Sequence, residues 1–389
     1  MIGQMTAVAE PEHHVESEQK VTPLELFFDL VFVFALTQVT TMMAGDPSWA
    51  GLARGMLVLS ALWWAWAAYS WLTNSVNAEE GATRATMIAA MAAALVASLA
   101  VPGAFGDEAL LFALAYTVLR LLHIVMYILA APSAEVRGAI ERMAPGFVVF
   151  CGLLIVASFF DGWAQGLIWL VALLIHVFGL IATGVRGWQV SASHFAERHG
   201  LIIIIALGES IVSIGVGAAG LEIDAGVVVA AALGILATSA LWWAYFDVVA
   251  PVAERRLASA RGAEQVRMAR DSYTFLHLPM IAGIVLLALG IKKTVGHYED
   301  ALKTVPAVAL CGGLALYLFA LVAFRLRNVH SWNRQRVVAG VVLLALIPVA
   351  TAVPALAALA LVTAVMCGLI AYEAIRFAEA RARVRQASR

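Results

Sequence analysis

Two carboxylates in one apolar segment are the first residues of this chain whose types and spacing point to chemistry. Glu25 and Asp29 lie four residues apart, so a helix carries both on one face. Lipid makes a charged side chain costly, and ionisable residues inside membrane segments mark ion or proton pathways. For Glu25 a structural role is an equal alternative, because Thr22, Pro23 and Glu25 form the pattern of a helix capping box. No cap explains Asp29.

A second acidic segment begins with Glu197, Arg198 and His199. We predict that these residues form the mouth of a pathway or, alternatively, a solvated cluster with internal ion pairs. Glu209 lies about 13–15 Å beyond Gly200 by helical rise, near the middle of a hydrocarbon core about 30 Å thick. A carboxylate at that depth is either protonated or paired. Glu209 is therefore the strongest functional candidate, with a neutral acid hydrogen-bonded between helices as the alternative.

Arg120 and His123 are three residues apart and share a face of another apolar segment. Arginine stays charged at any accessible pH, so Arg120 requires an acidic partner or a wet cavity. Glu209 and Asp29 are the carboxylates at comparable depth. We predict an ion pair between Arg120 and Glu209, which belongs to the pathway or is purely structural.

His277 lies one to two turns into a segment that begins at Asp271, a predicted helix N-cap. Pro279 follows it and is expected to free backbone groups nearby, as in the interrupted helices of transporters. His277 is therefore a further pathway candidate, with a simple helix–helix hydrogen bond as the alternative. His176 has no charged neighbour at helical spacing, which favours a packing role.

The composition identifies the solvent that surrounds these residues. The 389 residues are 62% hydrophobic and 13% charged, against roughly 45–50% and about 25% in soluble domains. A net charge of −1 and the lack of a basic stripe with interleaved aromatics argue against nucleic acid as a partner. The three cysteines lack metal-ligand spacing, and no phosphate loop, nucleophile elbow or zinc motif occurs. We therefore predict no catalytic residue, metal or cofactor.

The elements that must position the candidates are transmembrane helices, each of about 20 mostly apolar residues. We predict an all-α polytopic membrane protein of about 12 such helices. The predicted spans are residues 24–43, 52–72, 85–101, 109–130, 144–160, 165–185, 200–219, 226–249, 273–291, 304–324, 337–352 and 355–375.

A tryptophan fingerprint occurs twice, as Leu-Trp-Trp-Ala-Trp at 62–66 and Leu-Trp-Trp-Ala-Tyr at 241–245. Internal repeats are common in transporters. Because six spans per copy is an even number, we expect two six-helix repeats of parallel topology. The tryptophan pairs at 63–64 and 242–243 are interpreted as packing residues, with a platform for an aromatic ligand as the alternative. The predicted divisions are a cytosolic disordered tail (1–22), two membrane halves (23–187 and 188–376) and a basic cytosolic tail (377–389).

Positive charge sets the orientation of these spans. Twenty of the 25 Lys and Arg residues fall on the side that holds both termini. Cytoplasmic loops carry the excess of Lys and Arg, so we expect both termini in the cytoplasm.

Three stretches resemble the motifs of the bacterial low temperature requirement protein A (LtrA) family. They are LELFFDLVFV at 24–33, HFAERHG at 194–200 with ALGESI at 206–211, and HLPMIAG at 277–283. Together they span most of the chain. The resemblance implies a multi-pass protein of the bacterial cytoplasmic (inner) membrane with a link to growth at low temperature, and it implies no molecular activity.

From these residues we expect a transporter or permease with a proton- or ion-coupled pathway. An intramembrane enzyme acting on a lipid or apolar substrate is one alternative. A membrane sensor or organising protein, with the basic loop 251–270 on anionic lipid, is another. The expected partners are membrane lipids and a small molecule or ion, and the sequence indicates no oligomeric state. The pathway residues are Glu25, Asp29, Arg120, His123, Glu197, Arg198, His199, Glu209 and His277.

Overall fold

A computed structural model describes residues 20–76, 79 and 81–386 of the chain, all of whose regular elements are helices. Most of the predicted N-terminal tail lies outside these residues. The elements are α1 (Pro23–Gly45), α2 (Trp49–Thr73), α3 (Gly81–Leu99), α4 (Ala109–Ala130), α5 (Ala134–Ala157), α6 (Gly162–Ala182), α7 (Ala192–Ala218), α8 (Ala225–Phe246), α9 (Val249–Ser259), α10 (Gly262–Met268), the π-helix η1 (Ala269–Phe275), α11 (Leu276–Gly296), α12 (Thr304–Val329), α13 (Arg334–Ala345), α14 (Ile347–Ala350), α15 (Ala355–Arg376) and α16 (Ala378–Gln386).

Eleven helical segments in the described part of the chain are long and apolar enough to cross a membrane. A multi-pass, all-α membrane protein is therefore confirmed. The predicted span 337–352 differs from the others, because it is divided into α13 and α14 at Leu346. Pro348 explains the break, since a proline removes a helical hydrogen bond and its ring clashes with the carbonyl four residues earlier.

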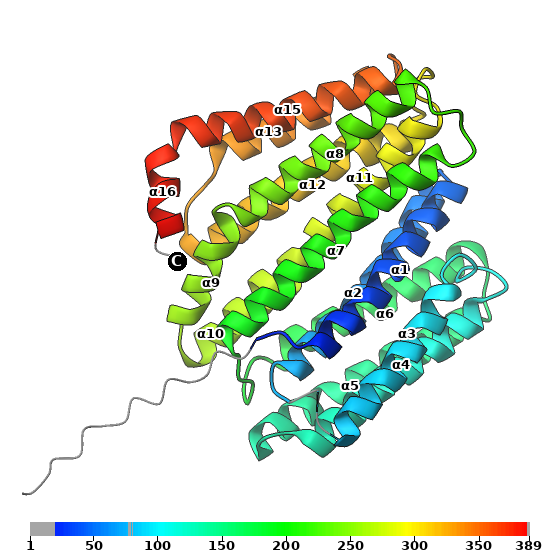
Figure 1. Cartoon of the computed structure of the whole chain (residues 1–389). Coiled ribbons are helices and arrows are strands. Elements are labelled where there is room, and N and C mark those ends of the chain that lie inside the picture. Colours follow the sequence, from blue (N-terminus) through cyan, green and yellow to red (C-terminus); the bar gives the residue numbers. More distant parts are fainter. Residues whose placement is uncertain (1–19, 77–78, 80, 387–389) are drawn as a thin grey trace, which may run out of the picture.

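The broken helix nevertheless runs the length of the bundle beside α12. The backbone N–H of Ala355 donates to the carbonyl of Asp300 at 2.8 Å, and that of Leu356 donates to Tyr298 at 3.0 Å. These bonds place the loop after α14 at the same end as the loop between α11 and α12. The start of α1 and the terminal helix α16 both lie at the opposite end of the bundle, on different sides of it (Figure 1).

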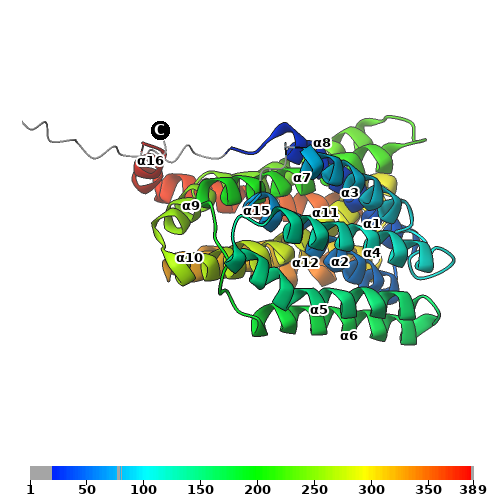
Figure 2. The same ribbon diagram turned by 90° about the horizontal axis from the view of Figure 1, so that it is seen from below.

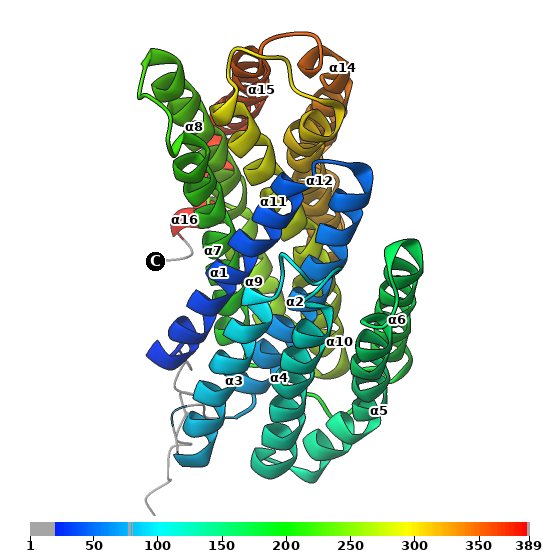
Figure 3. The same ribbon diagram turned by 90° about the vertical axis from the view of Figure 1, so that its right-hand side faces the viewer.

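Helix α11 is the centre of the bundle and contacts α7, α12, α1 and α8. Its approach to α12 depends on glycine, because a Cβ on Gly283 would lie 2.6 Å from the carbonyl oxygen of Gly313. In contrast, α5 and α6 pack on each other at the margin of the molecule (Figures 2 and 3). The parallel relation of the two halves stays a prediction.

The segment before α11 differs from the sequence prediction. Asp271, the predicted N-cap, lies inside η1 and pairs instead with Arg270 and Arg327, so that prediction is wrong. The winding changes from π to α after Phe275. Pro279 has no N–H to donate to the Phe275 carbonyl four residues earlier, and π-helical turns occur frequently at functional sites.

Candidate functional site

The start of α1 carries the predicted capping box. Thr22 Oγ1 accepts the backbone N–H of Glu25 at 3.4 Å, and the Glu25 carboxylate accepts the backbone N–H of Thr22 at 2.9 Å. Pro23 follows the cap. The predicted cap is confirmed. The Glu25 carboxylate that takes part in it also has partners on another helix.

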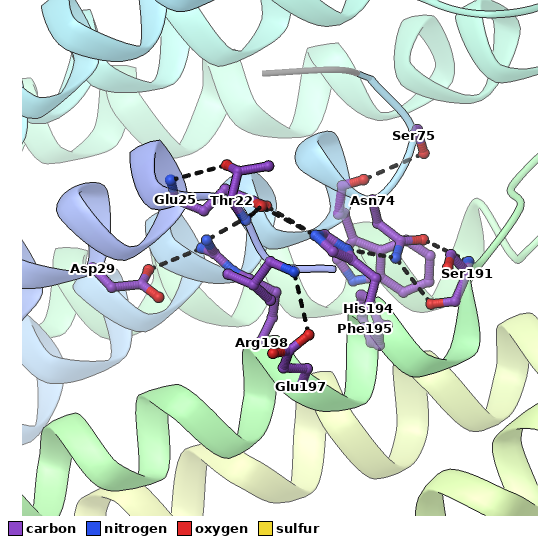
Figure 4. Close-up of polar contacts among 12 residues, drawn as sticks. Thr22, Glu25, Asp29, Asn74, Ser75, Ser191, His194, Phe195, Glu197 and Arg198 are labelled. Atoms are coloured by element: carbon purple, nitrogen blue, oxygen red, sulfur yellow. Dashed lines mark hydrogen bonds and ion pairs between the residues drawn. The ribbon is translucent and has the colours of Figure 1, made fainter. Parts of the chain in front are cut away.

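Glu25 and Asp29 of α1 meet His194 and Arg198 of α7 in a group that we call the α1–α7 charge cluster (Figure 4). Arg198 Nη2 donates to Asp29 Oδ1 at 2.9 Å, and its Nη1 lies 3.5 Å from Glu25 Oε1. His194 Nε2 lies 3.1 Å from Glu25 Oε2. All four residues are at most 1% exposed. Helical spacing explains the pairing, because each helix presents its two residues four positions apart on one face.

Trp66 extends the charge cluster to α2. Its Nε1–H donates to Asp29 Oδ1 at 2.9 Å, and the Arg198 guanidinium lies 5.8 Å from its ring centroid. Within residues 20–76, 79 and 81–386, Asp29 Oδ2 has no hydrogen-bond partner. The third tryptophan of the first fingerprint thus orients a buried carboxylate, a role that the sequence analysis did not predict.

The hydrogen bonds of Asn74 fix the protonation of His194. Asn74 Oδ1 accepts the N–H of Ser191 at 2.9 Å, and Asn74 Nδ2 donates to the Ser191 carbonyl at 3.0 Å. The second hydrogen of Nδ2 therefore faces His194 Nδ1 at 3.1 Å. Because Nδ1 accepts, the ring proton is on Nε2 and points at Glu25. His194 is thus neutral, and two carboxylates share one guanidinium.

Sequence reasoning selected Glu197 and did not select His194. Glu197 is exposed and accepts the backbone N–H of Val21 at 3.2 Å. It lines an open cavity of about 530 Å³ that Gly200 also borders. The signal for His194 was present, because it precedes Arg198 by four residues and shares its helix face, whereas Glu197 does not.

His199 and His277 form a separate imidazole pair with ring centroids 5.1 Å apart. His277 Nδ1 donates to the Ser272 carbonyl of η1 at 3.1 Å, so its Nε2 accepts the Tyr245 hydroxyl at 2.8 Å. His199 Nδ1 donates to the Phe195 carbonyl at 2.8 Å, and its Nε2 has no hydrogen-bond partner among the described residues. Tyr245 also lines the open cavity, which places the pair behind its wall.

The predicted pair of Glu209 with Arg120 is wrong. Glu209 accepts hydrogen bonds from the hydroxyls of Thr37 on α1 and Ser213 on its own helix. Arg120 Nη1 instead donates to the backbone carbonyl of Trp64 at 2.8 Å. The physical reason is packing: α4 lies on α2, α3 and α5, whereas Glu209 faces α1. Similar depth in the membrane does not make two helices neighbours.

His123 shares the surroundings of Arg120, as its spacing predicted. Its Nε2 lies 3.1 Å from the Ala68 carbonyl of α2, and the Arg120 guanidinium lies 4.2 Å from the Phe147 ring centroid. The structure therefore brings together Glu25, Asp29 and Arg198 at one place and Arg120 with His123 at another. Within the described residues, no group of three or more His, Cys, Asp or Glu is arranged to hold a metal ion.

Comparisons with known proteins match the sequence of this chain to a family. Residues 20–371 match the family described as bacterial low temperature requirement A protein (LtrA). A protein of Rhizobium meliloti (strain 1021), named uncharacterized protein RA0937, is 31% identical over 320 residues, covering 76% of this chain and 74% of that relative. No solved structure matches the chain.

Proposed function

The chain belongs to the bacterial low temperature requirement A (LtrA) family, and from that membership and its buried charges we propose that it is a proton-coupled membrane transporter. The α1–α7 charge cluster is the proton-binding element. The cytoplasmic membrane of a bacterium is its location, with both termini in the cytoplasm, because Lys and Arg are concentrated at that end. A role in growth at low temperature follows the description of the family.

The charge balance of the cluster is the observation that carries the proposal. With His194 neutral, the ionised carboxylates of Glu25 and Asp29 face one guanidinium, that of Arg198. The cluster is then one positive charge short of neutrality in a place closed to water. Buried net charge is costly, and one bound proton removes it. Asp29 Oδ2, which has no hydrogen-bond partner in the described part of the chain, is the atom to which we assign that proton.

Proton binding acts on the contact between α1 and α7. A neutral Asp29 is a weaker partner of Arg198, so the attraction that joins the two helices falls when the proton arrives. The exposed Glu197 and the open cavity beside it provide the entrance from the cytoplasmic end. Coupling requires that proton binding change the packing of two states, and a charge contact between two membrane helices meets that requirement.

The proposal is tested by proton flux in proteoliposomes that contain a trapped pH-sensitive dye. An imposed membrane potential, negative inside, is expected to drive faster proton entry with the wild type than in protein-free vesicles. Asp29→Asn should abolish the additional entry, since an amide cannot take up the proton. Asp46→Asn is the matched control, because Asp46 caps the other end of α1 and is 49% exposed. Equal rates in Asp29→Asn and the wild type would contradict the proposal.

Infrared difference spectroscopy tests the proton site itself without a flux assay. Titration of the purified protein is expected to show the C=O stretch of a protonated carboxyl group. That band should be missing in Asp29→Asn and present in Asp46→Asn. A band that is unchanged in Asp29→Asn would show that the proton binds to another group, and it would contradict the role of Asp29.

A further inference from the structure

Arg120 differs from the other buried arginines in its partners. Arg198, Arg336 and Arg381 each contact a carboxylate within 4.0 Å. Arg120 is 1% exposed and has no such contact among the residues that the structure describes. An arginine remains charged when buried, and a buried charge without a counter-charge is strongly unfavourable. A negative group is therefore missing beside Arg120.

Arg336 shows which group fits. Its Nη1 donates to the backbone carbonyl of Ala244 at 3.1 Å, while its Nε and Nη2 donate to the two carboxylate oxygens of Glu373 at 2.9 and 2.8 Å. Arg120 Nη1 likewise donates to a backbone carbonyl, that of Trp64. Its Nε and Nη2 are buried and have no hydrogen-bond partner among the residues that the structure describes. Nε and Nη2 form the edge of the guanidinium that binds a carboxylate through two parallel bonds.

A cavity of about 70 Å³ lies beside Arg120, between α2, α4, α5 and α6, and residues of α10 and η1, Arg270 among them, also line it. Trp64 and Phe147 supply apolar walls, and His123 and His176 also border it. Because one water needs roughly 10–15 Å³ by this measure, the cavity holds about five water-sized groups. That number matches the heavy atoms of a short carboxylate such as propionate. Gly184, Val185 and Trp188 of the loop after α6 also line the cavity.

We propose that this cavity is a binding site for a small carboxylate with an apolar body. The carboxylate takes the free edge of Arg120, and the apolar part lies against Phe147 and Trp64. The inference names a substrate class for the transport proposed above, and it depends on that proposal only for the statement that the anion crosses the membrane. Binding itself is tested without flux or a pH gradient, so the two proposals fail separately.

The test is calorimetric titration of the full-length protein in phosphatidylcholine nanodiscs. Propionate is expected to give saturable heat, and propanamide, which has the same shape without the charge, should bind at least about 10-fold more weakly, as for loss of a charged hydrogen-bond pair. Inorganic phosphate is the third probe, since it represents a free phosphate or a lipid headgroup. Equal binding of propionate and propanamide, or tighter binding of phosphate, would overturn the assignment.

Three variants locate the site. Arg120→Gln should lose propionate binding by the same factor, and Ala68→Leu should lose it by filling the cavity while Arg120 stays in place. Arg54→Gln is the matched control, because Arg54 lies on the same helix as Ala68, is 36% exposed and pairs with Asp46. If Arg120→Gln does not fold, the Ala68→Leu result and the comparison of propionate with propanamide still test the proposed site. Retained binding in Ala68→Leu would place the ligand elsewhere.

Discussion

Arg198 Nη2 on α7 lies 2.9 Å from Asp29 Oδ1 on α1, and both side chains are fully enclosed by protein. The two residues are 169 positions apart in the sequence. The contact therefore joins helices that enter the bundle from distant parts of the chain. Truncating one partner of a buried pair leaves the other charge uncompensated, which costs much more than the loss of a surface contact.

Arg198→Met is accordingly expected to destabilise the protein by about 3–5 kcal/mol. The variant leaves Glu25 and Asp29 without their guanidinium. Arg267→Gln is the control, since Arg267 pairs with Glu264 at a surface where both side chains are nearly half exposed, and it should cost less than about 1 kcal/mol. Denaturant unfolding in detergent measures both. Similar losses for the two variants would show that the α1–α7 contact contributes little.

Local patterns made the beginning of α1 predictable. The capping box needs only Thr22, Pro23 and Glu25, which are neighbours in sequence, and the structure contains it. The partner of Asp29 was not predictable in the same way, because it depends on which helices touch and in which rotation. Counting residues along each span places Glu209 and Arg120 at a similar depth in the membrane. They nevertheless lie on helices with different neighbours.

The span count shows the same limit. Hydropathy identified eleven spans that the structure confirms as long apolar helices, since that signal belongs to each segment alone. The remaining segment is apolar as well, yet Pro348 breaks it into α13 and α14. The backbone hydrogen bonds from Ala355 and Leu356 to the loop between α11 and α12 show that this broken segment reaches the far end of the bundle.

Glycine substitutions on α12 are expected to separate close packing from simple helix propensity. A Cβ on Gly313 would lie 2.7 Å from the Gly283 carbonyl oxygen and 2.8 Å from the backbone nitrogen of Leu287. Gly313→Ala should therefore cost about 1–3 kcal/mol by forcing α11 and α12 apart. At the adjacent Gly312 the nearest atom would be 3.6 Å away, so Gly312→Ala should be neutral or stabilise by up to about 1 kcal/mol. Thermal unfolding checks both, and equal effects would contradict the close approach.

The loop pair of Tyr298 and Asp224 predicts a pH dependence outside the membrane. The Tyr298 hydroxyl donates to Asp224 Oδ2 at 2.5 Å. This bond holds the pKa of Asp224 below its ordinary value of 3.8 and raises the pKa of Tyr298 to about 12. A carboxyl with a lowered folded pKa stabilises above its unfolded pKa, and the gain is lost as the pH falls through the folded value. The raised tyrosine pKa stabilises below its unfolded value of 10.0 and is lost as the pH rises through about 12.

Melting curves of Tyr298→Phe across this pH range check the expectation. The difference in melting temperature between wild type and variant should be constant near neutral pH and should shrink below pH 3.8. Tyr372→Phe, at an exposed tyrosine of α15, should show no such dependence. A difference that persists when Asp224 is protonated would mean that the bond does not act through its charge.

Removing the hydroxyl from each of two tyrosines beside His277 is expected to change the stability of the protein differently. Tyr245 Oη donates to His277 Nε2 at 2.8 Å, so Tyr245→Phe leaves a buried acceptor without a partner and should cost about 1–3 kcal/mol. Tyr273 stacks on the same imidazole with ring centroids 5.3 Å apart, but its buried hydroxyl has no hydrogen-bond partner in the part of the chain that the structure describes. Tyr273→Phe keeps the stacking and removes an unsatisfied group, so it should be neutral or stabilising. Denaturant unfolding distinguishes the two, and a larger loss for Tyr273→Phe would show that its hydroxyl, rather than that of Tyr245, holds the imidazole pair.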